Sequence, residues 1–303
     1  MTKKEFTVYS EYDGLALKGI VFEPENKPKG IVQLVHGMCE YKKRYEPLMA
    51  FFAENGYVAA CYDQRGHGES VEKDEDLGWF HDFDGKAIVE DAAQVTNYLR
   101  TEYPDLKLTL FGHSMGSMVV RCYLREHDAL IDKLIVCGSP SKNPLAGTAV
   151  LLAKTIRLFK GERHRSKMLS YLSTGKGNEE FVKAGKGSWL THDTEIVKAF
   201  HEDPKCRFHF TVNGFENLFR LMKNTYKKRG YQVKNPNLPI HFLSGSEDAV
   251  MGDEMKWFRS IEFLRNIGYT CVSGKIYEGM RHEVHNEIGK EAVYQDILHF
   301  IEE

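Results

Sequence analysis

The stretch KLTLFGHSMGSMVVRCYLREH, residues 107–127, decides the fold of this chain. Apolar side chains from Leu108 to Phe111 predict a short buried strand, and from Met115 onward apolar residues recur at helical spacing. Between the two lies GHSMG, residues 112–116, which matches G-x-S-x-G in the strand–turn–helix context that gives this pattern its meaning. The stretch therefore predicts a strand–helix unit with a serine at the sharp turn that joins the two elements.

The composition of this turn follows from its geometry. A strand that passes directly into a helix must reverse within one residue, which places Ser114 in a sparsely populated region of φ/ψ space. Gly112 and Gly116 have no Cβ atom to collide across so tight a bend. The Ser114 hydroxyl is thus presented at the start of a helix, where the Met115 N–H lacks a helical partner and the dipole favours an anion. Ser114 is the candidate nucleophile, and Met115 is a candidate donor to an oxyanion.

The composition of the whole chain is that of an ordinary globular protein. Of its 303 residues, 42% are hydrophobic and 28% are charged, and the formal net charge is −2. This length is sufficient for one large α/β domain, and the charge balance does not indicate a nucleic-acid partner. The N-terminal residues lack the apolar run of a signal peptide, and no stretch approaches 18 uncharged apolar residues. We therefore expect no membrane span.

Cysteine usage bears on the compartment. The six cysteines are far apart and form no C-x-x-C pair: Cys39, Cys61, Cys122, Cys137, Cys206 and Cys271. Several fall inside predicted strands or helices, as buried reduced thiols do. This usage favours the cytoplasm over an oxidising compartment.

Strands and helices alternate along most of the chain. Strands are predicted, beginning with an N-terminal hairpin, at residues 6–10, 15–22, 30–35, 57–62, 107–111, 133–137, 240–243 and 270–277. Helices are predicted at residues 44–55, 85–101, from 115, at 254–266 and near 287–300. The alternation predicts an α/β fold, with a mostly parallel eight-stranded sheet, helices on both faces and antiparallel strands at one edge. We expect residues 1–140 and 237–303 to form this core.

Residues 141–236 interrupt the alternation. They predict short helices separated by glycine-rich turns, at residues 144–159, 166–172, 179–184, 193–203 and 213–226. This segment contains 19 Lys and Arg against 8 Asp and Glu, whereas the rest of the chain contains 22 against 35. We therefore expect a cationic helical cap that is inserted in one loop of an acidic core.

Four sequence sites fall where the reactive groups of an open parallel sheet belong, at the carboxyl ends of its strands. Besides Ser114 they are HGM at 36–38, GSED at 245–248 and GMRH at 279–282. Together they supply a serine, an acid and a histidine in that order along the chain, which is the set of groups that acyl transfer requires.

A serine hydroxyl is a poor nucleophile at neutral pH and requires an adjacent base. We predict that His282 is this base and that Asp248 binds its other ring nitrogen, which fixes the tautomer and stabilises the imidazolium. The backbone N–H groups of Met38 and Met115 are predicted to hold the oxyanion, each worth about 3 kcal/mol to the transition state.

Neighbouring residues leave alternatives open for two of these roles. His285, three residues after His282, is an alternative base. Glu247 and Asp253 are alternatives to Asp248 as the acid. We favour the histidine that follows its strand sooner and the acid that ends the GSED turn.

Other reactive side chains near these motifs have structural interpretations. We expect His36 and His67 to brace loops. His113 is expected to pack beside the nucleophile, and Cys39 to be inert packing. The 13 histidines form no H-E-x-x-H pattern, so neither a metal nor a cofactor is predicted.

Five pieces of sequence carry a resemblance to a known family: HGMCEYKKRY at 36–45, DQRGHGES at 63–70, GHSMG at 112–116, GSED at 245–248 and GMRHE at 279–283. In this order they resemble the α/β-hydrolases of the monoacylglycerol lipase and lysophospholipase group, which are similar to serine aminopeptidases. The resemblance covers essentially the whole chain. It implies the α/β-hydrolase fold, and it gives the triad and the oxyanion donors to the residues named above.

The resemblance also implies esterase activity on a single acyl chain attached to glycerol or glycerophosphate, beneath a mobile cap over an apolar acyl channel. We therefore expect a cofactor-free serine carboxylesterase that acts through an acyl-enzyme. The chain departs from the family at Tyr41, where a histidine is frequent, and this leaves the polar contacts of Glu40 and Arg44 open. The cap is the least similar part, and it determines the substrate.

The cap sequence leaves its own surface open to two interpretations. Residues 151–167, LLAKTIRLFKGERHRSK, predict a basic amphipathic helix. Its apolar side chains either pack on the core, with a cationic face in water, or the helix contacts anionic lipid or a negatively charged substrate.

Three other functions fit the same scaffold. Acyl transfer to an acceptor other than water would use the same residues, and a non-catalytic binding module would not use them. An aminopeptidase fits the cap less well, because a substrate ammonium requires carboxylates and the cap has only eight, mostly dispersed.

Overall fold

The structure of the chain, a computed structural model, describes residues 1–175, 185 and 187–303. Eight strands form one sheet in the order β1-β2-β4-β3-β5-β6-β7-β8. The strands are β1 (Thr2–Tyr9), β2 (Ala16–Glu23), β3 (Gly30–Val35), β4 (Tyr57–Tyr62), β5 (Leu108–His113), β6 (Lys133–Cys137), β7 (Ile240–Gly245) and β8 (Val272–Tyr277). The predicted eight-stranded sheet is confirmed.

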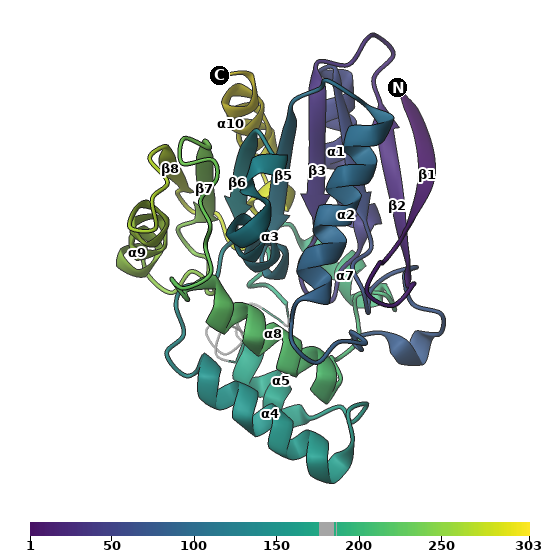
Figure 1. Ribbon diagram of the computed structural model, residues 1–303, viewed down its shortest axis with the longest axis vertical. Helices are drawn as coiled ribbons and strands as arrows, with labels where there is room; N and C mark the ends of the chain where they lie inside the picture. The colour runs from purple at the N-terminus through teal and green to yellow at the C-terminus, as the bar shows by residue number, and fades with distance from the viewer. Residues whose placement is uncertain (176–184, 186) are drawn as a thin grey trace.

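The sheet is antiparallel at one edge and parallel elsewhere (Figure 1). Strand β2 pairs antiparallel with both β1 and β4, and the pairs from β4 through β3, β5, β6 and β7 to β8 are all parallel. Parallel strands end at the same edge of a sheet. The residues that follow β3, β5, β6, β7 and β8 therefore meet at one edge.

Helices cover both faces of the sheet. One face carries α1 (Glu46–Glu54) and α10 (Lys290–Glu302), and the other carries α2 (Ala87–Glu102), α3 (Met115–His127) and α9 (Glu254–Arg265). Short 3-10 turns lie at Lys42–Tyr45, Asp74–Asp76, Asp128–Leu130 and Val284–Asn286. None of the helices formed by the described residues has the length and apolar character that crossing a bilayer requires. Five cysteines are buried in this fold, and Cys271 is exposed.

Residues 141–236 join β6 to β7 and are called the insert below. Their helices are α4 (Ala146–Lys160), α5 (Lys167–Ser170), α7 (Thr194–Glu202) and α8 (Val212–Thr225), with a π-helical turn at Tyr171–Gly175. Within the described residues the insert contains no strand. The helix predicted at 179–184 lies outside the described residues. In Figure 1, α4, α5 and α8 lie beneath the sheet, where α8 packs against both α3 and α4.

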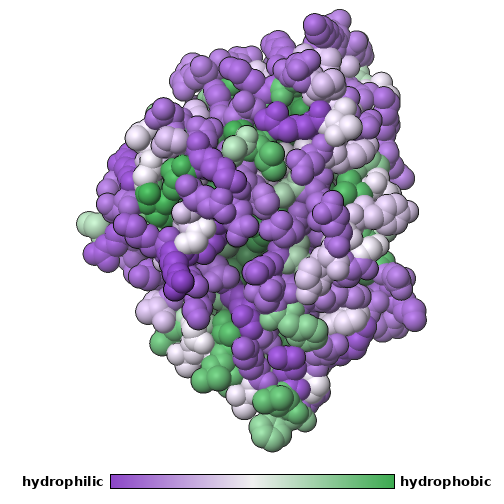
Figure 2. All heavy atoms as spheres, viewed as in Figure 1, coloured by the Kyte–Doolittle hydropathy of each residue, from purple (hydrophilic) through white to green (hydrophobic). Residues whose placement is uncertain are grey.

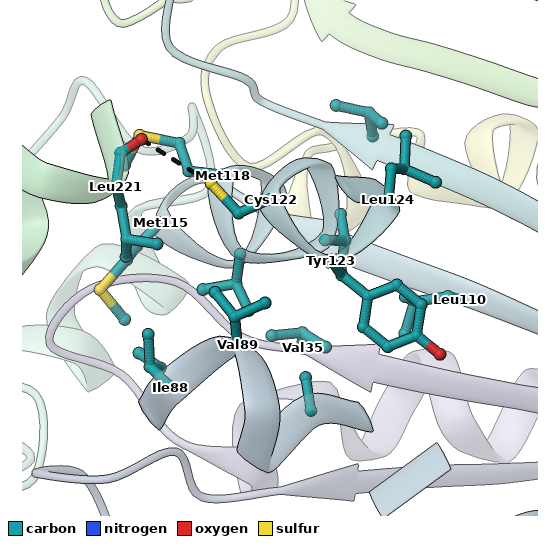
Figure 3. Packing of buried hydrophobic residues seen from close by; sticks show 14 of the residues in the cluster. Val35, Ile88, Val89, Leu110, Met115, Met118, Cys122, Tyr123, Leu124 and Leu221 are labelled. Carbon is teal, nitrogen blue, oxygen red and sulfur yellow. Dashed lines mark hydrogen bonds between the residues drawn. The ribbon is translucent and has the colours of Figure 1, made fainter. Parts of the chain in front are cut away.

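Helix α3 is held between the sheet, α2 and α8 (Figure 3). Its inner side chains lie in one buried cluster with Val35 of β3, Leu110 of β5 and Val89 of α2. Toward the insert, the Sγ atom of Cys122 lies 3.9 Å from the carbonyl oxygen of Leu221 in α8. Apolar packing on several sides fixes the position of α3, and with it the turn at its N-terminus.

Candidate active site

Ser114 occupies the sharp turn between β5 and α3. Its backbone has φ of 53° and ψ of −114°, a strained conformation, and its N–H donates to the Cys137 carbonyl of β6 at 3.0 Å. A Cβ atom on Gly116 would lie 2.1 Å from the Val35 carbonyl oxygen, and one on Gly112 would lie 2.5 Å from that of Gly116. The close approach of α3 to the sheet therefore requires both glycines of the motif.

The loop that follows β3 lies directly beside this serine. A Cβ atom on Gly37 would come within 3.2 Å of the Ser114 Cβ, so the next residue, Met38, lies close to Ser114. Met115 is the first residue of α3, where N–H groups have no partner within the helix. The structure thus brings the two residues predicted as oxyanion donors to the predicted nucleophile.

A buried histidine–carboxylate pair lies on the loops after β7 and β8. The Nδ1 atom of His282 is 2.9 Å from Oδ1 of Asp248, and these side chains are 1% and 0% exposed. The Asp248 carboxylate also accepts the Val250 N–H at 2.8 Å and the Ser244 hydroxyl at 3.2 Å. Among the described residues, the Nε2 atom of His282 has no hydrogen-bond partner. Nε2 is thus the ring nitrogen left to exchange a proton.

Each member of this pair stabilises the charged form of the other. Burial alone would lower the pKa of His282, but the Asp248 carboxylate outweighs it and holds this pKa above its usual value. Burial alone would raise the pKa of Asp248, but His282 and the Val250 N–H hold it below its usual value. The site therefore favours an imidazolium beside a carboxylate, which is the arrangement that forms when the histidine accepts a proton.

Ser114 and His282, the predicted nucleophile and base, both lie near the end of β6. A Cβ atom on Gly138 would lie 3.1 Å from Cε1 of His282, and the preceding residue, Cys137, accepts the Ser114 N–H. The rings of His282 and His113 are 4.8 Å apart between centroids, and His113 directly precedes the serine. The glycine thus leaves room for the His282 imidazole at the edge of the sheet that carries Ser114.

His285, the alternative base, lies in a different environment. Its ring stacks on that of Tyr45 at 5.1 Å and lies 4.6 Å from that of His113. The ring is buried, neither of its nitrogens has a partner within the described part of the chain, and burial lowers its pKa to about 3. The structure therefore places His285 in the core, whereas Asp248 hydrogen-bonds to His282.

The two alternative acids lie at the surface. Glu247 is 47% exposed, and its carboxylate is 3.3 Å from Nε2 of His192. Asp253 is the N-cap of α9 and accepts the Lys256 N–H at 2.8 Å. Both carboxylates therefore have partners of their own outside the buried pair.

The neighbouring histidines hold loops. The Nε2 atom of His36 accepts the Gln64 N–H at 2.9 Å, and that of His67 accepts the Cys39 N–H at 3.4 Å. The Cys39 thiol lies 3.3 Å from the Phe208 carbonyl oxygen, and burial raises its pKa. In the part of the chain that the structure describes, no three His, Cys, Asp or Glu side chains are grouped to hold a metal ion.

Comparison with known proteins identifies the family. The model of the family described as serine aminopeptidase, S33, matches residues 26–289. The chain belongs to this family. The chain is 25% identical over 281 residues to a monoacylglycerol lipase of Mycolicibacterium smegmatis, across 93% of its own length and 91% of the relative. It is 27% identical over 286 residues to human monoglyceride lipase, across 91% and 82% of the two chains.

Solved structures show the same fold. A thermostable carboxyl esterase from Bacillus coagulans, in complex with glycerol, superposes on this chain with a TM-score of 0.89 at 28% identity, covering 100% of this chain and 98% of the esterase. A soluble variant of monoglyceride lipase from Saccharomyces cerevisiae, in complex with a substrate analogue, superposes with a TM-score of 0.71 at 20% identity, covering 100% and 97%. The chain is thus a serine ester hydrolase with the α/β-hydrolase fold, as its motifs indicate.

One set of contacts beside the predicted site was not evident from the sequence. Arg44 donates to the Glu283 carboxylate at 2.8 and 2.7 Å and to Glu40 at 2.7 Å. Burial would raise the pKa of Glu283, but Arg44 holds it at about 2. The contacts left open by Tyr41 are therefore formed, and they tie the loop after β3 to the residue after His282. The four-residue spacing of Glu40 and Arg44 indicates their own contact, but nothing in the sequence indicates Glu283.

Proposed function

We propose that this chain hydrolyses carboxylic esters of a single acyl chain, such as monoacylglycerols and lysophospholipids, through an acyl-enzyme on Ser114. The observation that carries the proposal is the buried His282–Asp248 pair near a serine on a strained strand–helix turn. Relatives named as monoacylglycerol and monoglyceride lipases support a lipid ester as the substrate. So does a phospholipase of Bacillus subtilis, 21% identical over 89% of this chain and 94% of its own.

In the proposed reaction, Nε2 of His282 accepts the Ser114 proton as the serine Oγ bonds to the ester carbonyl carbon. The carbonyl π electrons move onto oxygen, and the N–H groups of Met38 and Met115 hold the oxyanion. When the oxyanion collapses, the ester C–O bond breaks and the leaving alcohol takes the proton from the histidine. Water then attacks the acyl-enzyme by the same steps and releases the fatty acid. Asp248 stabilises the imidazolium in both halves.

We further propose that residues 1–140 and 237–303 form the catalytic core and that the insert caps its site. Two contacts support this division. The ring of Trp189 lies 5.0 Å from that of His282, and the Cys39 thiol lies 3.3 Å from the Phe208 carbonyl oxygen. In the first contact a residue of the insert meets the proposed base, and in the second it meets Cys39, which directly follows Met38. We expect the insert to determine which acyl chains enter.

An ester panel tests the proposed function. It compares monoacylglycerols, lysophosphatidylcholines, triacylglycerols and aryl esters over a range of chain lengths, with aminoacyl anilides as a peptidase arm. We expect turnover with monoacyl esters and little with triacylglycerols or anilides. Preferred turnover of the anilides would contradict an esterase. Transfer products with added alcohols or thiols would instead identify an acyltransferase, and failure to react with a fluorophosphonate probe would indicate a non-catalytic protein.

The outer face of α4 supports a contact with anionic membrane surfaces, which we also propose. Leu151, Leu158 and Phe159 are 65%, 81% and 83% exposed, whereas Val150 and Ala153 are buried. The interpretation in which the apolar side chains of this helix pack on the core is therefore incomplete, because α4 is apolar on its outer face as well. Figure 2 shows apolar residues gathered at the end of the molecule that carries the insert. Apolar side chains beside cationic ones are typical of helices that lie on anionic lipid.

Vesicle co-sedimentation tests this contact. Binding is measured to phosphatidylcholine vesicles with and without phosphatidylglycerol, at low and high salt. We expect more binding with the anionic lipid, weaker binding at high salt, and a loss on Phe159→Asp. The matched control is Met255→Asp, which changes an apolar residue that is 62% exposed on α9 of the core. Binding that does not change with lipid charge, with salt or on Phe159→Asp would contradict the proposal.

A further inference from the structure

A short piece of the insert runs along the loop that carries His282. The carbonyl groups of Trp189 and Leu190 accept the N–H groups of His282 and Glu283 at 3.5 and 2.7 Å. One residue earlier, the Ser188 carbonyl accepts Nη1 of Arg281 at 2.7 Å. Three consecutive residues of the insert therefore bind three consecutive residues of the histidine loop, two through backbone N–H groups and one through the Arg281 side chain.

The far end of this piece is anchored as well. The Glu287 carboxylate, which is 2% exposed, accepts the backbone N–H of His192 at 3.0 Å and lies 3.0 Å from its Nδ1 atom. The same carboxylate accepts the N–H of Arg281 at 3.0 Å. The Thr191 hydroxyl donates to the Asn286 carbonyl at 3.2 Å. Residues 188–192 are thus fixed to both ends of the histidine loop.

The side chain of Trp189 covers the imidazole at the centre of this contact. The two ring centroids are 5.0 Å apart with an interplanar angle of 37°. The indole is partly exposed, whereas His282 is 1% exposed. The hydrogen bond to Asp248 holds only the Nδ1 atom of the imidazole, and the ring can still rotate about its own Cβ–Cγ bond when that hydrogen bond stretches or breaks. A flat side chain against the ring restricts this rotation.

We infer that Trp189 is a positioning residue for the reaction, by which the insert holds the proposed base in its working orientation. This inference rests on the proposed function, because it assigns Trp189 a role through His282. It goes beyond that function, because the insert then acts on the chemistry as well as on access. A displacement of residues 188–192 would release the imidazole, so the state of the cap and the readiness of the base are coupled.

The chain offers a matched control in Trp79. This indole also lies against a histidine, with its centroid 3.5 Å from that of His81 and the same interplanar angle of 37°. It also touches the insert, because the guanidinium carbon of Arg163 lies 3.6 Å from its ring centroid. Both indoles therefore lie against a histidine at a contact between the core and the insert, but Trp79 does so away from the proposed base.

The first test is steady-state kinetics with an aryl ester. We expect Trp189→Ala to lower kcat about tenfold to a hundredfold with little change in KM, since small misplacements of a catalytic group have effects of this size. Trp189→Phe keeps a flat ring and should restore kcat to within a few-fold. Trp79→Ala should leave kcat unchanged. A Trp189→Ala variant with normal kcat, or a Trp79→Ala variant with an equal loss, would overturn the inference.

The second test is fluorescence, which requires no turnover. An imidazolium in contact with an indole quenches its emission, so the emission lost on Trp189→Phe should titrate with the pKa seen in the acid limb of kcat/KM. This titration should disappear in His282→Gln and persist in Trp79→Phe. A pH titration of Trp189 emission that is the same in His282→Gln as in the parent chain would overturn the inference. Loss of ester turnover in His282→Gln tests the proposed function separately, so the two failures are distinguishable.

Discussion

Helices α3 and α4 are similar in length but are held in different ways. Ten of the 13 residues of α3 are buried, against three of the 15 residues of α4. Helix α3 is packed between the sheet and α8, whereas α4 packs on α8 and turns large apolar side chains outward. The core therefore fixes the groups of the proposed chemistry, whereas the insert carries side chains that remain available to a substrate or a surface.

We expect the largest effect on activity at the turn before α3, which carries Ser114. We expect Ser114→Ala to lower kcat for aryl and monoacyl esters by about 10⁶-fold, the usual loss for a triad nucleophile. The melting temperature should stay close to that of the parent chain. The control is Ser273→Ala, an exposed serine of the edge strand β8, which should retain full activity. Ester turnover by Ser114→Ala at a substantial fraction of the parent rate would end the assignment.

The turn after β7 carries a buried carboxylate, that of Asp248, directly beside an exposed one, that of Glu247. Substitutions of the two therefore compare a buried and an exposed group at nearly the same place. We expect Asp248→Asn to lower kcat by about 10⁴-fold, since an amide cannot hold the required histidine tautomer or stabilise its cation. Glu247→Gln, one residue earlier and 47% exposed, should stay within a few-fold of the parent. Steady-state kinetics on the two variants shows which carboxylate supports the histidine. A larger loss of kcat in Glu247→Gln than in Asp248→Asn would assign that role to Glu247.

The free energy of unfolding compares the packing of α3 and α4 directly. Leu124 of α3 is 0% exposed, and Leu158 of α4 is 81% exposed. We expect Leu124→Ala to lower the free energy of unfolding by about 2–5 kcal/mol, because it leaves a cavity in a packed core. Leu158→Ala should change it by less than about 0.5 kcal/mol. Urea unfolding monitored by circular dichroism provides both values, and equal losses would remove the distinction between the helices.

The smallest effect concerns pH. Because His282 must be neutral to accept the serine proton and its pKa is raised, the acid limb of kcat/KM should have its midpoint above 6.5. Asp248→Asn removes the carboxylate that raises this pKa, so its residual activity should show a lower midpoint. The raised pKa also means that protonated His282 stabilises the folded chain at pH below about 6.5, and this contribution is lost as pH rises through the folded pKa. An acid limb below 6.5 would contradict the pairing.

The core was largely predictable because its elements repeat a simple burial pattern. The all-buried strand β3 occupies residues 30–35, as its apolar run predicts, and β5 extends two residues beyond the predicted Phe111 to the turn. Differences are confined to element ends, as at β8, which begins at Val272 and not at Thr270. The order of serine, acid and histidine along the chain then indicated which loops meet, because parallel strands present them at one edge.

The contacts that were missed join residues distant in sequence without a periodic pattern. Nothing near Glu283 in the sequence indicates that Arg44 binds its carboxylate. Nothing near Trp189 indicates that its ring lies against that of His282. The sequence left the orientation of α4 open for a different reason. Leu151 and Phe159 are apolar, and composition alone assigns such residues to the interior, whereas the structure exposes both.

The single exposed thiol provides a practical handle on the insert. Cys271 directly precedes β8, at the amino ends of the parallel strands and thus at the opposite end of the sheet from Ser114. A maleimide dye should therefore react there without disturbing the proposed site, and the five buried thiols need not be replaced. With a second dye on Leu158→Cys, energy transfer between the two fluorophores would show whether the insert moves during turnover.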